Sequence, residues 1–474
     1  MTKAPWDSVP VHETFFVLVT GANSGIGFGI CQRLVDEFLI SRSLTSHLVL
    51  IPTARSAKKS QDAVDGIRRH CRRAAETSQS LRSRSGPHYD PRDTTRRVHV
   101  VSVQLDLCNF ASIRDASNQL VAGTFDSPCD DGWFESLAGV TIPRLDAVIF
   151  NAGVGGWYGL DWWPLLKNFF TDGIVQATTW PKFKGAVAGL TVNPWPDAKG
   201  AADPSQTTPV LGEVFCANVF GHYILGHELL PLLCRPKDSP VPPGRIVWES
   251  SIEPRRDDFS LSDFQGIKTR MAYESSKRLT DILALTSDLP AVRPHSSAYF
   301  DVGGRAPQTP PKLYLAHPGV VVTSLFPLNA FLFFWYRLAL YLARLLGSPW
   351  HVNTAYKGAL APVWVALHDA ATLDAAAGGS AQRIKWGSCC DRWGCEDVKK
   401  TEVEGWGWEG KLEDRAALDQ DLATGVLRKL QGRRDGAKDL TREQLEEFEA
   451  EGAECWREME RLRKEWWTDR IGSK

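Results

Sequence analysis

Short, wholly apolar segments recur along the first two thirds of the chain, and most lack the alternation of a half-exposed strand. Continuous apolar strands are expected in a parallel sheet that helices cover on both faces. Helical patterns separate several of these segments, and one of them, from Ile26 to about Leu39, directly follows the first. The pattern predicts an α/β protein with a Rossmann-type, doubly wound parallel sheet. The apolar, strand-like segments are 15–19, 47–51, 98–103, 147–150, 245–248 and 312–316.

Three segments interrupt this rhythm and are predicted to be insertions in one large domain, residues 1–380. Residues 66–97 are rich in Arg and Ser, which favours a solvated surface segment over a patch for an anionic partner. Residues 288–311 contain prolines and are predicted to form a loop. Residues 154–210 carry many aromatic side chains, which should pack on the sheet or wall an apolar pocket rather than lie free in solvent. The tryptophans of this last segment are Trp157, Trp162, Trp163, Trp180 and Trp195.

The chain changes character after residue 380. Residues 381–474 are predicted to form a charged, Trp-rich extension that ends in a helix near 442–467. Thr441 and Gln444 have the spacing of a capping box at the start of that helix. Apolar residues follow at helical spacing, which favours docking on the main domain over binding of a partner. These residues are Leu445, Phe448, Gly452, Cys455, Met459, Leu462 and Trp466.

An apolar helix is predicted near 326–347, and it raises the question of membrane contact. Pro327 and two arginines weaken a spanning helix, which needs about 20 apolar residues. Arg337, Tyr341 and Arg344 fall on one helical face, opposite a broad Leu/Phe face. This geometry suits a helix that lies in the membrane interface with its arginines at the headgroups. The alternative is an ordinary helix that covers a cleft and turns its apolar face to the protein.

Composition excludes several classes of protein. The chain has 474 residues, of which 43% are hydrophobic and 23% charged, so it is neither disordered nor fibrous nor a small disulfide scaffold. A net charge of −1 gives no electrostatic case for nucleic acid. The N-terminus lacks the pattern of a secretory signal. Ten scattered cysteines suit free thiols in a reducing compartment, and the cluster Cys389, Cys390 and Cys395 lacks CxxC spacing, so no metal is expected.

A glycine-rich turn, TGANSGIG at 20–27, joins the first strand-like segment to the first helical one. Glycines remove Cβ atoms where the backbone must approach a pyrophosphate, and the helix N-terminus aims free N–H groups at that charge. The flanking strand and helix make this signal much stronger than a lone glycine motif. We predict a dinucleotide site that contains Gly21, Ser24, Gly25, Ile26 and Gly27.

The end of the second strand-like segment bears on the type of dinucleotide. A nicotinamide cofactor without a 2′-phosphate usually meets an acidic side chain there, and this sequence has none. It offers Thr53 and Arg55, with Lys58 and Lys59 close behind. Because cationic groups suit a 2′-phosphate, we predict NADPH/NADP+ rather than NADH, bound with Thr53, Arg55 and Lys58. The alternative is that these are solvated surface charges.

Tyr273 and Lys277 stand four residues apart in a helical segment and therefore share one face. A tyrosine with a pKa of ~10 is a poor base at neutral pH, but a nearby ammonium lowers that pKa. The same lysine can hold a cofactor ribose. The strand-like segment 245–248 ends in Ser250 and Ser251, which supply a hydroxyl to hold a carbonyl oxygen. These residues predict a site for hydride transfer to or from a carbonyl.

Over about residues 14–325 these motifs, in their order, resemble the short-chain dehydrogenase/reductase family. Tyr273, Lys277 and Ser251 resemble three members of its catalytic tetrad, and Asn218 resembles the fourth. The gap between Ser251 and Tyr273 is longer than the family usually has. The resemblance also implies cofactor contacts from Asp106 at the adenine, from the Asn-Ala-Gly motif and from the residues after Pro-Gly. These last contacts are Asn151, Ala152, Gly153, Val321 and Thr323.

Within that family the chain is similar to the fungal 3-keto-sterol reductases of ergosterol synthesis. The segments that carry this similarity are 151–157, 211–225, 246–251 and 402–408. The resemblance implies an NADP-dependent oxidoreductase that reduces a C3 ketone to a 3β-hydroxyl during C4 demethylation of sterols. It also implies peripheral contact with the endoplasmic-reticulum membrane or lipid droplets, on the cytosolic face, and complexes with other sterol-synthesis enzymes.

The resemblance gives each tetrad residue a role. Tyr273 would protonate the developing alkoxide, Ser251 would hydrogen-bond its oxygen, Lys277 would tune Tyr273 and bind ribose, and Asn218 would hold a relay water. Two other functions stay open at this point. One is a short-chain carbonyl reductase that acts on another lipid or polyketide ketone. The other is a cofactor-binding scaffold for a membrane sterol enzyme, although a pure scaffold has no need of a complete tetrad.

Overall fold

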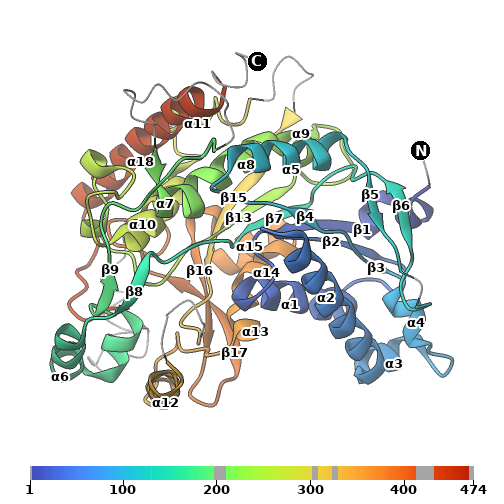
Figure 1. The fold of residues 1–474 in the computed structure, drawn as a ribbon, viewed down its shortest axis with the longest axis horizontal. Helices are drawn as coiled ribbons and strands as arrows, with labels where there is room; N and C mark the ends of the chain where they lie inside the picture. Colours follow the sequence, from blue (N-terminus) through green and yellow to red (C-terminus); the bar gives the residue numbers. More distant parts are fainter. Residues whose placement is uncertain are drawn as a thin grey trace.

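A mostly parallel sheet runs through the middle of the molecule (Figure 1). The computed structural model describes residues 3–129, 131–196, 210–301, 308–322, 329–412 and 432–468. Over these residues the sheet has nine strands, in the order β3-β2-β1-β7-β13-β15-β16-β17, with β4 also paired to β2. Only the β16–β17 pairing is antiparallel within that sheet. The strands are β1 (Thr14–Val19), β2 (His47–Ala54), β3 (Val98–Val100), β4 (Val103–Gln104), β7 (Ala147–Phe150), β13 (Arg245–Glu249), β15 (Lys312–His317), β16 (Lys385–Cys390) and β17 (Glu396–Thr401).

The strand order confirms the predicted doubly wound α/β fold. From β1 the chain builds one half of the sheet through β2 and β3, and then crosses to β7 on the other side of β1. Such a reversal leaves a crevice at the carboxyl ends of the strands, where ligands bind in folds of this type. The segment expected as one strand at 98–103 forms two short strands, β3 and β4, which both pair with β2.

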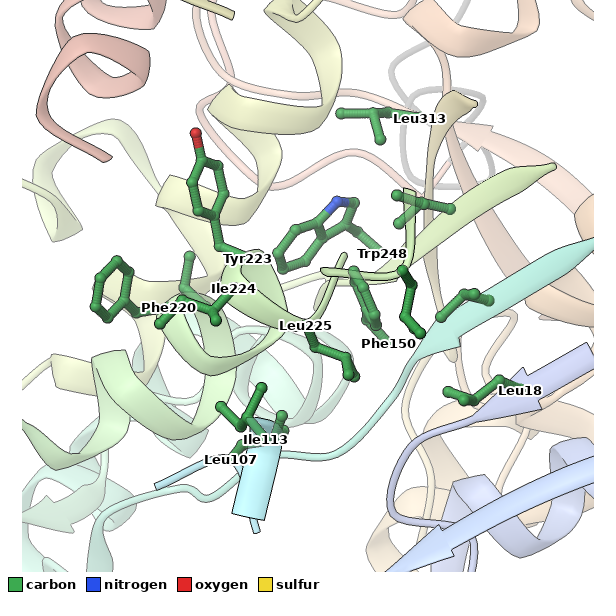
Figure 2. Packing of buried hydrophobic residues seen from close by; sticks show 14 of the residues in the cluster. Leu18, Leu107, Ile113, Phe150, Phe220, Tyr223, Ile224, Leu225, Trp248 and Leu313 are labelled. Atoms are coloured by element: carbon green, nitrogen blue, oxygen red, sulfur yellow. The ribbon is translucent and has the colours of Figure 1, made fainter. Parts of the chain in front are cut away.

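The central strands are apolar on both faces because helices cover both sides of the sheet. In β1, Phe16 and Leu18 face one buried cluster, whereas Val17 and Val19 face the other. Figure 2 shows part of the first cluster, where side chains from the α8 region pack over Phe150 and Trp248. Helices α5 (Phe110–Ala122), α7 (Glu213–Phe215), α8 (Gly221–Glu228), α10 (Ala272–Thr286) and α18 (Arg442–Arg463) cover that face, and α1 (Gly25–Ser41), α2 (Ala57–Thr77) and α14 (Leu360–Leu367) cover the other.

The C-terminal region is built into the main body. Helix α18 begins with the predicted capping box of Thr441 and Gln444. It packs against α10 and α11 (Arg293–Ser296), and the Trp456 indole donates to the carbonyl oxygen of Leu283 at 3.2 Å. The prediction that this helix docks on the main domain is confirmed. Strands β16 and β17 join the central sheet, so the change in composition at residue 381 does not mark the edge of the sheet.

Residues 66–97, expected to be a solvated surface segment, are mainly helical. They comprise the second half of α2, then α3 (Gln79–Ser85) and α4 (Pro91–Thr95). One side of these helices is buried in the core through Ile67, Cys71 and Leu81. The expectation of a solvated segment is therefore wrong for that side. Arginines and serines dominate the composition of 66–97, but a few apolar residues at helical spacing form a stripe that packs on the core.

The insertion at 154–210 and the apolar segment near 326–347 lie together at one end of the molecule (Figure 1). The insertion forms β8 (Trp157–Leu160), α6 (Trp162–Thr179) and β9 (Lys184–Ala186), and α6 packs on α12 (Ala330–Leu345). Trp195 is buried in the core, as expected. Trp163 is 78% exposed, so the expectation that the tryptophans avoid solvent is wrong for this residue.

Helix α12 has the two-sided character that its sequence predicts. The guanidinium carbons of Arg337 and Arg344 lie 5.7 and 4.7 Å from the ring centroid of Tyr341, which confirms that the three residues share a face. Among the described residues, no helix combines the length and the apolar character that crossing a bilayer requires. The loop expected at 288–311 contains α11 and β14 (Gln308–Thr309), and its residues 302–307 lie outside the described part of the chain.

Candidate active site

The glycine turn between β1 and α1 is packed too tightly for side chains. Gly21 has a φ of +66°, and a Cβ atom there would lie 2.9 Å from the Cα atom of Ala152. A Cβ atom on Gly27 would lie 2.3 Å from the carbonyl oxygen of Gly21. Real Cβ atoms do not approach backbone this closely, so the turn requires glycine at both positions.

Hydrogen bonds tie this turn to the end of β7. The backbone N–H groups of Asn151 and Ala152 donate to the Thr20 hydroxyl at 2.9 and 3.0 Å. The Asn151 amide donates to the carbonyl oxygen of Thr20 at 2.9 Å, and Gly21 N–H donates to the Thr53 hydroxyl at 3.3 Å. The structure thus brings the predicted Asn-Ala-Gly motif and Thr53 against the glycine turn.

A buried histidine that the sequence did not reveal supports the same turn. Burial lowers the pKa of His222 to about 3, so the ring is neutral. Its Nδ1 lies 3.2 Å from the carbonyl oxygen of Asn218 and must carry the proton, since a carbonyl only accepts. Nε2 therefore accepts from the Thr20 hydroxyl at 2.9 Å. No local motif marks this histidine, because its partner is about 200 residues earlier in the chain.

The remaining predicted cofactor residues lie at the start of α1, at the start of α2 and after β4. Ser24 is the N-cap of α1 and, like Gly25, is exposed, so the first N–H groups of α1 face an open side. Arg55 and Lys58 are exposed at the start of α2. Asp106 follows β4, where its carboxylate accepts from Cys108 N–H at 3.0 Å. These features fit a dinucleotide, since an open helix N-terminus and a backbone stripped of Cβ atoms admit a pyrophosphate.

The four residues predicted as a catalytic tetrad converge next to this turn. Ser251 and Tyr273 line the same cavity, and the Ser251 hydroxyl lies close enough to the Tyr273 phenol to lower the pKa of that phenol. The Lys277 ammonium lies 5.7 Å from the Tyr273 ring centroid and donates to the carbonyl oxygen of Glu249 at 2.7 Å. Asn218 lies in a π-helical turn, Cys216–Phe220, where its amide donates to the Val154 carbonyl at 3.0 Å and accepts from the Val154 N–H at 2.8 Å.

The two adjacent serines at the end of β13 have different surroundings. Ser250 is buried and donates to the carboxylate of Asp281, which also pairs with Lys385 at 2.6 Å. Ser251 lines the cavity together with Tyr273, whereas Ser250 does not. Only Ser251 therefore stands where it can share a ligand oxygen with Tyr273, despite the long sequence gap between them.

The pKa of Tyr273 differs in direction from the sequence expectation. Burial, followed by the carboxyl of Glu253, raises this pKa well above its ordinary value, and the hydrogen bond from Ser251 opposes the rise. The sequence predicted that Lys277 would lower the pKa of Tyr273. This prediction is wrong for the sum of all influences, because the pKa is raised. The lysine itself is buried, which lowers its own pKa to about 8. A phenol with a raised pKa stays protonated at neutral pH, and this suits a proton donor.

A cavity of about 380 Å³ opens over Ser251 and Tyr273, within the range of ~300–1,000 Å³ typical of small-molecule sites. Its far walls are apolar and come from the 154–210 insertion and from α12. Helix α12 thus covers a cleft, as one of the two alternatives proposed. Val321 lines the cavity beside Pro318 and Gly319, and Thr323 lies outside the described residues. The apolar and aromatic lining includes Trp157, Trp162, Leu165, Phe169, Phe183, Leu332, Trp335 and Tyr336.

The sequence did not reveal a cluster of charges in this cavity. Lys184 of β9 pairs with Glu253, two residues after Ser251, and with Glu274, next to Tyr273. The positions of the two glutamates beside predicted catalytic residues were an available signal. The lysine comes from the insertion, and no local pattern connects it to the site.

Comparison with known proteins identifies the relatives of this chain. No family model matches it. It is 49% identical over 467 residues to the 3-keto-steroid reductase ERG27 of Gibberella zeae, covering 98% of this chain and 96% of that protein. It is 41% identical over 466 residues to the 3-keto-steroid reductase of Aspergillus fumigatus, covering 95% and 94%. A solved 3-oxoacyl-[acyl-carrier protein] reductase from Brucella melitensis in complex with NAD aligns with a TM-score of 0.38 and 14% identity, over 77% of this chain and 93% of that one.

The parallel sheet, the glycine turn at its crevice and the Ser-Tyr-Lys arrangement define an oxidoreductase of the short-chain dehydrogenase/reductase class. Within this class, the identity to the fungal proteins over nearly the whole chain decides the family. The chain belongs to the 3-keto-steroid reductase family.

Proposed function

We propose that this protein reduces the C3 ketone of a sterol to a 3β-hydroxyl with NADPH, as a step of C4 demethylation in ergosterol synthesis. The observation that carries this proposal is the position of Ser251 and Tyr273 at the base of a largely apolar cavity. A sterol is apolar except near its oxygen, so it needs one polar end in an otherwise apolar pocket. The relatives named 3-keto-steroid reductases support the same substrate class.

In this mechanism the bound cofactor supplies the hydride for the C3 carbon. Tyr273 donates its phenolic proton to the oxygen, which becomes an alkoxide as the carbonyl is reduced. Ser251 donates a hydrogen bond to the same oxygen and holds it in reach of the phenol. Because burial and Glu253 raise the pKa of Tyr273, the phenol enters the reaction protonated. This state favours the reductive direction.

Lys277 and Asn218 support the proton donor. The Lys277 ammonium is fixed by the carbonyl oxygen of Glu249 and lies 5.7 Å from the ring centroid of Tyr273. There it can bind ribose and pass protons. The amide of Asn218 is engaged by Val154 and by the Ser276 hydroxyl at 3.0 Å. In the proposed relay Asn218 therefore positions the loop after β7 beside Lys277, rather than holding a water through its amide.

The proposed preference for NADPH over NADH depends on the end of β2. Arg55 and Lys58 are exposed beside the N-terminus of α2. The segment between β2 and α2 has no acidic side chain that could accept from a ribose 2′-hydroxyl. A guanidinium and an ammonium at this place fit the extra negative charge of a 2′-phosphate. Thr53 holds the glycine turn through Gly21 and so contributes to the same site.

Peripheral contact with the endoplasmic-reticulum membrane or a lipid droplet is the second part of the proposal. Helices α6 and α12 line the cavity and also expose large apolar side chains. The two helices pack on each other and lie at one end of the molecule (Figure 1). Phe170 is 87% exposed and Phe331 70%. Such an exposed apolar surface is typical of a lipid or protein contact. Since it is continuous with the cavity wall, a sterol could pass from lipid to Tyr273 without full exposure to water.

The test is an NADPH-oxidation assay of the purified chain with a panel of ketones in detergent micelles. We expect turnover of 3-keto sterols such as zymosterone, with the 3β-alcohol as product by mass spectrometry. Faster turnover of polyketide or non-steroid lipid ketones would instead support a carbonyl reductase with another substrate. The absence of turnover with every ketone, despite NADPH binding, would contradict the enzymatic proposal and favour a scaffold.

A further inference from the structure

Three charged side chains meet at one wall of the cavity, beside the proposed proton donor. The ammonium of Lys184 pairs with a carboxylate oxygen of Glu253 and lies 2.9 Å from an oxygen of Glu274. The Lys184 and Glu274 side chains are buried, and Glu253 is mostly buried but lines the cavity. The three residues come from β9, from the loop after β13 and from α10. Their meeting is therefore a product of the tertiary fold.

This cluster and Tyr273 form one packed unit. The Lys184 ammonium lies 4.1 Å from the ring centroid of Trp157 and 5.1 Å from that of Tyr273. The Trp157 and Tyr273 rings are 4.8 Å apart and steeply inclined. Glu253 N–H donates to the Ser251 hydroxyl oxygen at 3.3 Å. The cluster thus touches both residues that are proposed to hold the substrate oxygen.

The charges of the cluster do not balance, because one ammonium serves two carboxyl groups. Burial raises the pKa of Glu253 to about 7, Lys184 opposes this rise, and a hydrogen bond with Glu274 adds to it. When both carboxyls are ionised, the cluster therefore carries one more negative than positive charge. Burying such a set costs desolvation energy that an apolar wall would not incur, and the rest of this wall is apolar.

We propose that the Lys184–Glu253–Glu274 cluster positions Tyr273 for catalysis and holds its hydroxyl in the protonated, donating form. The excess negative charge next to the ring opposes ionisation of the phenol, while Lys184 fixes the ring through Trp157. Glu253 is thus a positioning residue that acts through Tyr273. This inference rests on the proposed ketone reduction, since it takes Tyr273 as the proton donor.

Other titratable groups near the phenol also affect the pKa of Tyr273. The Lys277 ammonium lies 5.7 Å from the ring centroid of Tyr273, and its positive charge favours the phenolate. Glu249 is buried under Lys277 and adds to the rise of the Tyr273 pKa, as Glu253 and Glu274 do. Tyr336 of α12 lines the same cavity and is uncharged at neutral pH, because burial raises its pKa. Among these groups, Glu253 and Lys184 can be exchanged without altering a proposed tetrad residue.

The experiment compares pH profiles of kcat/KM with zymosterone and NADPH, and of the reverse oxidation with NADP+, for wild type, Glu253→Gln and Lys184→Met. In Glu253→Gln the loss of negative charge favours the phenolate. We therefore expect the apparent pKa that governs both profiles to fall by about one unit. Lys184→Met removes a positive charge, so its apparent pKa should rise. Glu253→Asp keeps the charge and should restore a profile close to wild type.

Controls separate this inference from the proposed function and from simple loss of folding. Glu460→Gln removes another buried carboxylate, which pairs with Arg463 at 2.8 Å on α18, and should leave the apparent pKa unchanged. Thermal unfolding and NADPH fluorescence report folding of each variant. Uniform slowing of Glu253→Gln and Glu253→Asp at every pH, without a shift, would overturn the inference even if Tyr273→Phe is inactive. An active Tyr273→Phe would instead overturn the proposed function.

Discussion

The cofactor side and the substrate side of the crevice are built in different ways. On the cofactor side, the glycine turn packs directly against the backbone at the end of β7. Its glycines leave no room for a Cβ atom, and the N–H groups of Asn151 and Ala152 donate to the Thr20 hydroxyl. On the substrate side, the wall consists of large side chains from α6 and α12, several of which also face outward. A pyrophosphate is charged and is bound by backbone N–H groups that must come close to it. An apolar ligand is bound by burying its surface against large apolar side chains.

This difference predicts how each side of the crevice should respond to substitutions. A single methyl group is enough to disturb the backbone cradle, because nothing there can move aside. The apolar wall should tolerate changes of shape among hydrophobic side chains but should respond strongly to charge on its outer face. Tyr273 lies between the two sides. It lines the cavity, and it is near Lys277, the residue proposed to bind the cofactor ribose.

Tyr273→Phe is the change with the largest expected effect. It removes only the hydroxyl that we propose as the proton donor, and general acid catalysis is worth about 10²–10⁴-fold in rate. We expect kcat to fall by that factor while the Kd for NADPH, measured by fluorescence, changes little. Tyr314→Phe removes the same atom from a buried tyrosine of β15 and should keep its turnover. Near-normal kcat in Tyr273→Phe would refute its role as proton donor.

Gly27→Ala tests the backbone cradle. The added Cβ atom would meet the carbonyl oxygen of Gly21 and the amide of Asn151, so the turn must distort. A strain of about 1–3 kcal/mol corresponds to a loss of NADPH affinity of roughly five- to 150-fold. Gly159→Ala, where a Cβ atom meets nothing within 4 Å, is the matched control. Equal NADPH affinity in both variants would show that the cofactor does not depend on this turn.

Phe331→Asp combined with Phe334→Asp tests the outer face of the apolar wall. Both side chains are exposed on α12 and do not line the cavity. Burial of one such side chain is worth about 1.5–3 kcal/mol, so liposome flotation should fall at least tenfold. Turnover of detergent-dispersed sterol should persist. Val121→Asp on α5 changes a partly exposed apolar residue elsewhere and should float like wild type; equal flotation of the double variant would exclude α12 as the contact.

Arg55→Asp tests cofactor choice. The variant loses a charged hydrogen bond, worth about 1.5–3 kcal/mol, to the 2′-phosphate. We expect the ratio of kcat/KM for NADPH to that for NADH to fall by at least tenfold. Lys3→Asp changes an exposed cation near the N-terminus and serves as the charge control. An unchanged ratio in Arg55→Asp would assign these cations to the solvated surface.

Much of the fold and of the reactive centre could be predicted because those features are local in sequence. The run at 15–19 and the glycine turn specify strand, turn and helix within about 30 residues. Tyr273 and Lys277 share a face because a helix places residues four apart together. The capping box at Thr441 likewise involves neighbours in the chain.

Other features of the site depend on contacts between distant segments. Lys184 meets Glu253 and Glu274 only after the insertion folds over α10, and His222 reaches Thr20 across the sheet. The raised pKa of Tyr273 comes from burial, which a helical pattern cannot specify. The buried side of 66–97 and the addition of β16 and β17 to the sheet are also decided by packing.

The sequence alone therefore determined the class of fold, and it supplied the predicted dinucleotide turn and the candidate reacting side chains, because each follows from periodicity or close spacing. Only the tertiary structure decided which serine faces the phenol, which charges surround it and how the apolar wall divides between cavity and surface. These properties depend on distances through space and on exclusion of water, and both arise when segments far apart in the chain pack together.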